Sequence, residues 1–292
     1  MSDAGRDRPP PAPDPLPIAV VDNHTHLDLA RDGDDAPDIE AVIEAAAAVG
    51  VPRMVQIGCD LRGARFTVEV IDRYRALLGG VALHPNEAPK LGERGEVDSA
   101  RREIERLASH PRVRVIGETG LDYFRTGAEG VGEQQDSFRW HIDLAKRTGK
   151  TLQIHDRDAH QDVLRILAEE GAPARTVLHC FSGDITMARE CVQRGYFLSF
   201  AGTVTFKNAT GLRNALAVTP MENLLVETDA PYLTPVPHRG ATNAPYLVPL
   251  TVRAMAAVLS TDVPSLCTAL AANSELLYGP WWTQSGPQNT HS

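Results

Sequence analysis

Short apolar segments alternate with helix-like stretches along almost the whole sequence. Eight segments rich in Val, Ile and Leu are separated by stretches whose apolar residues recur every three to four positions, and several of these stretches end at a glycine. The eight segments are residues 18–28, 53–58, 80–84, 113–118, 151–155, 176–179, 196–200 and 224–229. Eight strand–helix units over about 260 residues predict a closed (β/α)8 TIM barrel that forms a single α/β domain.

A doubly wound open sheet is the structural alternative, because it also alternates strands with helices. Sheets of that kind that bind dinucleotides carry a Gly-rich sequence in the first strand–helix turn. No such sequence follows residues 18–28. The barrel is therefore the favoured architecture, although residues 196–200 and the helix near 212–218 show the weakest pattern.

Two end segments fall outside the expected domain of residues 18–279. Residues 1–17 are rich in Pro, Asp and Arg, a composition that cannot bury a core, so we expect a disordered Pro-rich N-terminal tail. Residues 280–292 are expected to form a polar C-terminal tail, with Trp281-Trp282 as a surface contact.

Charge and cysteine usage narrow the functional classes. The net charge of −9 argues against a broadly basic surface for nucleic acid, but not against nucleic acid at a cleft that holds metal ions. The four cysteines show no paired spacing, as expected for buried thiols in a reducing compartment. No apolar run is long enough to cross a bilayer and no signal peptide is visible, so we expect a cytoplasmic protein without a membrane partner.

Polar side chains close six of the eight predicted strands at the same relative place. They are His24 and His26, His84, Glu118, His155 with Asp156 and Arg157, His179, and Asp229. TIM-barrel enzymes carry their chemistry at the carboxyl ends of the strands. One such histidine would more often be a core or rim residue, but six strand ends of this kind indicate a shared site.

Six of these side chains have the chemistry of a divalent metal site. His24 and His26 stand two residues apart, so in a strand both rings project from one face. With His155, His179, Glu118 and Asp229 they offer nitrogen and oxygen ligands but no thiolate, which suits Zn, Mn or Mg rather than a Cys-rich structural zinc site. Six ligands exceed what one catalytic ion needs, so we expect two divalent ions, with Glu118 as the bridge.

Several sequence blocks resemble the TatD-type metal-dependent hydrolases, which are related to the amidohydrolase superfamily. The blocks are residues 22–28, 82–85, 117–123, 154–157, 179–183 and 227–233, and the resemblance covers nearly all of residues 18–279. It implies a TIM-barrel hydrolase with two metal ions, many members being Mg- or Mn-dependent deoxyribonucleases. It also implies that one ion is held by His24, His26, Glu118 and Asp229, and the other by Glu118, His155 and His179.

Two positions depart from the family pattern. The family often has Arg-Asn-Glu-Pro after the eighth strand, where this chain has Thr242-Asn243-Ala244-Pro245, and it often has a second polar ring where Asn86 stands. Neither change removes a metal ligand. Both bear on the contacts of the loops and on the choice of substrate.

The expected roles follow from these assignments. As a hypothesis, a hydroxide shared by the ions attacks phosphorus or a carbonyl carbon, and Asp229 takes and returns the proton, with Glu118 as the other catalytic residue. His84 and Arg157 are expected to bind substrate oxygens, although each could equally support the rim of the site. Tyr123 is expected to line the cleft.

Three functions are compatible with such a site. The first is a deoxyribonuclease that trims single-stranded DNA or 3′ ends, acting like a 3′–5′ exonuclease. The alternative is a small-molecule amidohydrolase or esterase, because fold and metals do not choose the bond that is cleaved. A non-catalytic metal-stabilised protein is the third, and it is disfavoured because a structural site has little use for open coordination positions. No obligate protein partner is expected.

Overall fold

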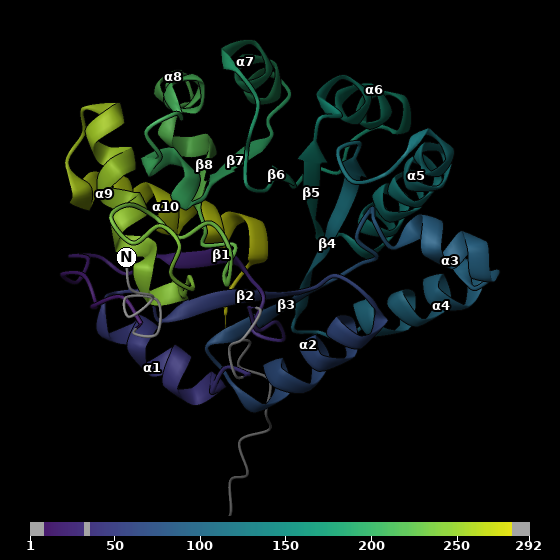
Figure 1. Cartoon of the computed structure of the whole chain (residues 1–292), viewed down its shortest axis with the longest axis horizontal. Coiled ribbons are helices and arrows are strands. Elements are labelled where there is room, and N and C mark those ends of the chain that lie inside the picture. Colours follow the sequence, from purple (N-terminus) through teal and green to yellow (C-terminus); the bar gives the residue numbers. More distant parts are fainter. Residues whose placement is uncertain (1–8, 32–35, 282–292) are drawn as a thin grey trace, which may run out of the picture.

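Eight parallel strands form one sheet in the order of the sequence, from β1 to β8 (Figure 1). The computed structural model describes residues 9–31 and 36–281. A doubly wound sheet would reverse its strand order, so the prediction of a (β/α)8 barrel is confirmed. The strands are β1 Val21–Thr25, β2 Arg53–Gly58, β3 Leu77–Val81, β4 Val113–Asp122, β5 Thr151–Arg157, β6 Thr176–Leu178, β7 Phe197–Phe200 and β8 Leu224–Val226.

The barrel closes where the end of β8 meets β1. Thr25 and Ala230 form a parallel bridge there. The backbone N–H of Asp229 donates to the carbonyl of His24 (2.9 Å), and the N–H of His26 donates to the carbonyl of Ala230 (2.9 Å). The closure is therefore made by the same short segments that carry three of the predicted site residues.

Helices surround the sheet (Figure 1). Several begin at an aspartate whose carboxylate accepts backbone N–H groups of the first turn, as Asp38, Asp60 and Asp184 do. One short helix, α3, was not expected from the sequence. The helices are α1 Ile39–Ala48, α2 Leu61–Arg73, α3 Ala88–Arg94, α4 Val97–Ala108, α5 Val131–Thr148, α6 His160–Glu170, α7 Ile185–Gln193, α8 Thr210–Ala217, α9 Val248–Leu259 and α10 Val263–Tyr278.

No single helix in the described ranges is both long enough and apolar enough to cross a membrane. Only the segments Pro245–Leu259 and Val263–Tyr278 taken together have the required length and composition, and they bend by 111° at their junction.

Strand β4 is longer than the sequence predicted and this changes the geometry of the site. It continues four residues beyond Glu118, because Thr119 to Asp122 pair with Ile154 to Arg157 of β5. Gly120 makes this pairing feasible: its φ is +138°, and a Cβ there would lie 2.1 Å from the carbonyl oxygen of His155. The two strands thus run side by side to the level of the site.

Apolar side chains from the strands fill the inside of the barrel near the amino ends of the strands. This cluster contains Val21, Val55, Ile57, Leu78, Val115, Val177, Phe197 and Leu225, and the C-terminal segment adds Leu277, Tyr278 and Trp281. The indole Nε1–H of Trp281 donates to the carbonyl of Ala76 (3.1 Å). Trp281 is only 4% exposed, so the prediction of a surface contact is wrong for this residue; Trp282 lies outside the described residues.

The segment before β1 also differs from the prediction. Residues 9–17 form no helix or strand, but Leu16 is buried and its N–H donates to the carbonyl of Val49 (3.0 Å). The hydroxyl of Tyr246 donates to the carbonyl of Pro10 (2.7 Å). These contacts contradict a disordered tail for residues 10–16, whereas residues 1–8 lie outside the described ranges.

Replacing Trp281 by Ala should destabilise the protein, because it removes a large buried side chain from the apolar cluster inside the barrel. We expect the free energy of unfolding, measured by urea titration, to fall by about 3–5 kcal/mol. Trp281→Phe retains most of the apolar contact and should cost clearly less. An alanine variant as stable as the parent would show that Trp281 does not stabilise this cluster.

Candidate metal centre

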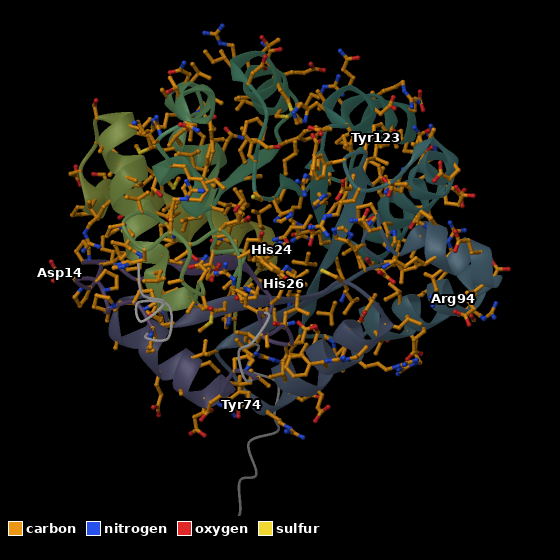
Figure 2. All side chains as sticks on the ribbon, viewed as in Figure 1. Asp14, His24, His26, Tyr74, Arg94 and Tyr123 are labelled. Atoms are coloured by element: carbon orange, nitrogen blue, oxygen red, sulfur yellow. The ribbon has the colours of Figure 1, made fainter. Side chains whose placement is uncertain are left out.

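The six predicted ligands meet at the carboxyl ends of the strands. Figure 2 shows His24 and His26 near the middle of the barrel. Their Nε2 atoms lie 3.2 Å apart, because both side chains leave β1 on the same side. Of the other four side chains, Glu118 and His155 come from within β4 and β5, and His179 and Asp229 follow β6 and β8.

One group of donor atoms surrounds the two histidines of β1. The Nε2 of His24 lies 3.5 Å from Oε2 of Glu118 and 3.9 Å from Oδ1 of Asp229. The Nε2 of His26 lies 3.9 Å and 3.3 Å from the same two oxygens. Four donor atoms therefore face a common point, as expected for the ligands of one ion.

A second group gathers on the other oxygen of Glu118. Its Oε1 lies 2.5 Å from Nδ1 of His155 and 2.8 Å from Nε2 of His179. The Nε2 of His84 is 3.5 Å from the same oxygen. The two oxygens of Glu118 thus face two separate groups, which is the arrangement expected of a bridging carboxylate.

The histidines of β1 are held from behind by oxygen atoms. The Nδ1 of His24 lies 2.9 Å from Oε1 of Gln153, and the Nδ1 of His26 lies 2.9 Å from the carbonyl of Ile57. Because each of these oxygens accepts a hydrogen bond from Nδ1–H, the ring presents the lone pair of Nε2 to the site. Metal-binding histidines are commonly oriented in this way.

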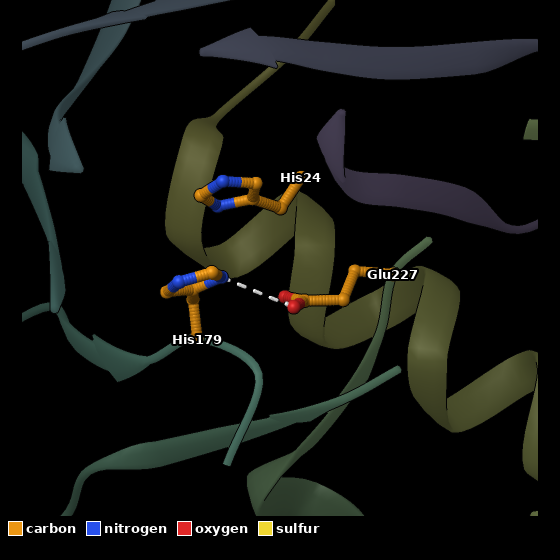
Figure 3. Close-up of side chains that lie close together, drawn as sticks. All are labelled: His24, His179 and Glu227. Atoms are coloured by element: carbon orange, nitrogen blue, oxygen red, sulfur yellow. Dashed lines mark hydrogen bonds and ion pairs between the residues drawn. The ribbon is translucent and has the colours of Figure 1, made fainter. Parts of the chain in front are cut away.

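Carboxylates lie beside the other ring nitrogens of His179 and His155; the one beside His179 forms a hydrogen bond, whereas Nε2 of His155 has no hydrogen-bond partner among the described residues. The Nδ1 of His179 lies 3.1 Å from Oε1 of Glu227 (Figure 3), and the Nε2 of His155 lies 3.4 Å from Oδ2 of Asp122. Glu227 is fully buried, and its Oε2 has no hydrogen-bond partner among the described residues. His24, His179 and Glu227 also form one of the clusters that could hold an ion.

These supporting residues were not predicted from the sequence. Gln153 carried a signal, because it is a polar side chain inside an otherwise apolar strand, and Asp122 and Glu227 lie within the matched blocks. Cys59 was expected to be a buried apolar residue, but its thiol lies 3.4 Å from Oε2 of Glu118. Its part in the site could not be seen without the pairing of the strands.

The histidines of the site keep its two carboxylates ionised. Burial raises the pKa of the Glu118 carboxyl, but the positive charges of His179, His84 and His155 outweigh it and hold this pKa well below its usual value. Burial also raises the pKa of the Asp229 carboxyl, but the hydrogen bond from His26 outweighs this effect and leaves the pKa below its usual value. Both carboxylates are therefore ionised at neutral pH and able to bind metal.

Two of the three predicted substrate-binding residues lie at the site. His84 faces Glu118, and Arg157 lines a cavity of about 310 Å³ together with Glu118, His179 and Asp229. Tyr123 is not among the residues that line this cavity. Its hydroxyl donates to Oδ2 of Asp162 (2.8 Å) and accepts from Gln135 (2.7 Å), and Figure 2 shows it away from His24 and His26.

Both departures from the family pattern lie close to the site. Ala244 lines a second, mainly apolar cavity of about 200 Å³ that also reaches His26 and Ala230. The Nδ2 of Asn86 donates to Oδ2 of Asp122 (3.0 Å), the same oxygen that faces His155. Asn86 therefore helps to hold Asp122 in place.

Metal affinity should fall as the pH falls. Burial lowers the pKa of His155, but Glu118 and Asp122 outweigh this effect and raise the pKa to about 9. Below that pH, an ion must therefore displace the proton on Nδ1. We expect the affinity for Mn²⁺ between pH 6 and 8 to drop about ten-fold per pH unit for each proton displaced. Titration calorimetry in buffers of different ionisation enthalpy measures the released protons, and no release would contradict the assignment of His155.

Comparison with known proteins agrees with this geometry. A family model described as TatD related DNase matches residues 21–279. The chain is 48% identical to a Mycobacterium tuberculosis protein named uncharacterized metal-dependent hydrolase TatD, over 90% of this chain and 99% of that protein. It is 37% identical to the Bacillus subtilis metal-dependent hydrolase YabD, over 89% and 98% of the two chains.

A solved structure shares the fold. The crystal structure of YJJV, a TatD homologue from Escherichia coli, superposes with a TM-score of 0.80 at 26% identity, covering 89% of this chain and 98% of that one. The barrel, the cluster of histidines and carboxylates, and the family match lead to one conclusion. This chain belongs to the TatD family of metal-dependent hydrolases.

Proposed function

We propose that this hydrolase is a deoxyribonuclease that cleaves phosphodiester bonds near single-stranded 3′ ends. The observation that carries the proposal is a cationic residue, Arg157, in the wall of the cavity that also contains Glu118 and Asp229. A phosphodiester needs a cationic donor beside the carboxylates and histidines that would hold two divalent ions. The family match, TatD related DNase, supports the same substrate.

The residues of the site divide into two binding groups joined by Glu118. His24, His26 and Asp229 would hold one ion, and His155 and His179 would hold the other. Mg, Mn or Zn bound there would polarise the scissile bond and lower the pKa of the attacking water. Glu118 sets the separation of the two groups, since each of its oxygens faces one of them.

Asp229 is the residue proposed to move the proton. Its Oδ1 lies 3.3 Å from Nε2 of His26, and its lowered pKa keeps it ionised, so it can accept a proton from the attacking water. The same oxygen can then return the proton to the leaving oxygen. The backbone of Asp229 has a φ of +55°, and its N–H donates a hydrogen bond to the carbonyl of His24. This hydrogen bond fixes the backbone that carries the carboxylate.

Arg157 and His84 are proposed to contact the phosphate. Arg157 offers planar paired donors, which match two phosphate oxygens better than a lysine would. His84 approaches the second group from β3, with its Nε2 3.5 Å from Glu118. DNA contact would be confined to this rim, because the net charge of −9 gives the protein no general attraction for a polyanion.

A small-molecule amidohydrolase or esterase is the second candidate. The observation in its favour is the mainly apolar cavity of about 200 Å³ beside His26, which is lined by Ala244 and Pro245. An acyl group of a small ester or lactone would suit such a wall. The identity of the substrate therefore has to be tested on both classes.

Purified protein with Mg²⁺ or Mn²⁺ should degrade a 5′-labelled single-stranded oligonucleotide. Asp229→Asn keeps the size of the side chain but cannot accept the proton, so we expect a rate about 10²–10⁴-fold lower, with folding unchanged. Glu118→Ala should lose both the activity and the binding of a second metal ion, measured by calorimetry. Products resolved on a denaturing gel show whether the cleavage proceeds from the 3′ end.

Two outcomes would contradict the proposal. Equal degradation by the parent and by Glu118→Ala would indicate a contaminating nuclease. Hydrolysis of nitrophenyl esters or lactones without any cleavage of DNA would favour the small-molecule alternative.

A further inference from the structure

We infer that Phe124 and Arg157 form a stacking subsite for an unpaired nucleobase next to the bond that is cleaved. This inference rests on the proposed function and deepens it, because it names the part of the DNA strand that the site recognises. We call the two residues the Phe124–Arg157 platform.

Phe124 is exposed to an extent that a structural role does not explain. Its side chain is 64% exposed, more than that of any other aromatic residue among the large exposed apolar residues of the described chain. An aromatic ring with this exposure contributes little to the core and offers a face to a ligand. The neighbouring Tyr123 is half-buried and hydrogen-bonded to Asp162, so only Phe124 of this pair is exposed.

Arg157 covers one part of the ring and connects it to the cavity. The guanidinium carbon lies 3.9 Å from the centre of the Phe124 ring. Arg157 is the last residue of β5, and its carbonyl accepts the N–H of Tyr123 (2.9 Å), so the pairing of β4 with β5 fixes both residues. A cation stacked on one face leaves the other face for a base.

A single carboxylate ties the platform to the candidate metal centre. Oδ1 of Asp122 accepts the backbone N–H of Phe124 (3.1 Å), and Oδ2 of Asp122 lies 3.4 Å from Nε2 of His155. Arg157 lines the 310 Å³ cavity together with Glu118 and Asp229. A nucleotide whose phosphate occupies that cavity therefore has its base within reach of the platform.

The chemistry of the platform suits a nucleobase of a single strand. Every base has an aromatic face, so stacking on Phe124 would tolerate any sequence, and Arg157 adds a cation beside the phosphate. In a duplex the base faces are already stacked on their neighbours. The platform thus predicts a preference for an unpaired end over a blunt duplex end.

The test compares Phe124→Ala with the parent on three substrates. These are a single-stranded oligonucleotide, the same oligonucleotide with an abasic nucleotide at each of its last three positions in turn, and the same oligonucleotide with all three of these positions abasic, all with Mn²⁺. We expect kcat/KM on the normal strand to fall about ten-fold or more. At the abasic position that removes the stacked base, the parent should be slowed as much and the variant should lose nothing further, and both should cleave the strand with three abasic positions equally.

Two further variants separate stacking from a structural effect. Phe124→Trp keeps an aromatic face and should retain the activity on the normal strand. Leu276→Ala is the matched control, because Leu276 has the same exposed fraction of 64% but lies on α10, and it should cleave like the parent. Melting temperatures of all variants should agree with that of the parent.

The outcomes distinguish this inference from the proposed function. Cleavage of DNA that is unaffected by Phe124→Ala, or slowed equally on the strand with three abasic positions, overturns the platform but keeps the nuclease. A parent that binds the strand by fluorescence anisotropy without cleaving it, and loses that binding in Phe124→Ala, keeps the platform but overturns the nuclease. If the parent neither binds nor cleaves the strand, both the platform and the nuclease proposal are overturned.

Discussion

The carboxylate of Glu118 is the interaction on which the rest of the site depends. It is buried among five histidines, and an ionised carboxylate in such a place is tolerated only when hydrogen bonds and opposite charges compensate for the lost hydration. Each of its oxygens faces a different group of nitrogens. The barrel supplies this geometry because its parallel strands all deliver their carboxyl ends to one place.

Outside that carboxylate, the structure is organised to hold the histidine rings in one orientation. Gln153 illustrates the point: its Oε1 lies 2.9 Å from Nδ1 of His24, while its Nε2 donates to the carbonyl of Asn23 (2.8 Å) and to the hydroxyl of Tyr278 (3.1 Å). A polar side chain inside a barrel would be costly without such partners. The chain of contacts leads from the C-terminal helix, through β5, to a candidate metal ligand on β1.

The predicted ligands could be found from the sequence because they recur after apolar segments of similar length. The supporting residues could not, since they are defined by which strands pair and in which register. Tyr123 shows the difference. The sequence suggested that β4 ended at Glu118, but the strand continues to Asp122, and alternate residues of a strand face opposite sides. Asp122 therefore faces His155, whereas Tyr123 packs against the core outside the barrel.

Errors at the two ends of the chain have the same origin. The composition of residues 10–16 gave no reason to expect that Leu16 would be buried beside Val49, or that Tyr246 would bond to Pro10. Trp281 was expected at the surface because it lies in a polar segment, yet it packs into the apolar cluster inside the barrel. Tertiary contacts of this kind carry no periodic signal, and so pattern and composition could not reveal them.

The charge of the protein links metal binding to substrate binding. The cavity contains Glu118 and Asp229, both ionised, and Arg157 is the one arginine among the described residues that line it. A phosphodiester brought to these carboxylates alone would be repelled, and the net charge of −9 offers no compensation at longer range. Two divalent ions would reverse the sign of the local field. If DNA is the substrate, the ions and the strand must therefore strengthen each other's binding, and Arg157 with Phe124 would only orient a strand that the ions attract.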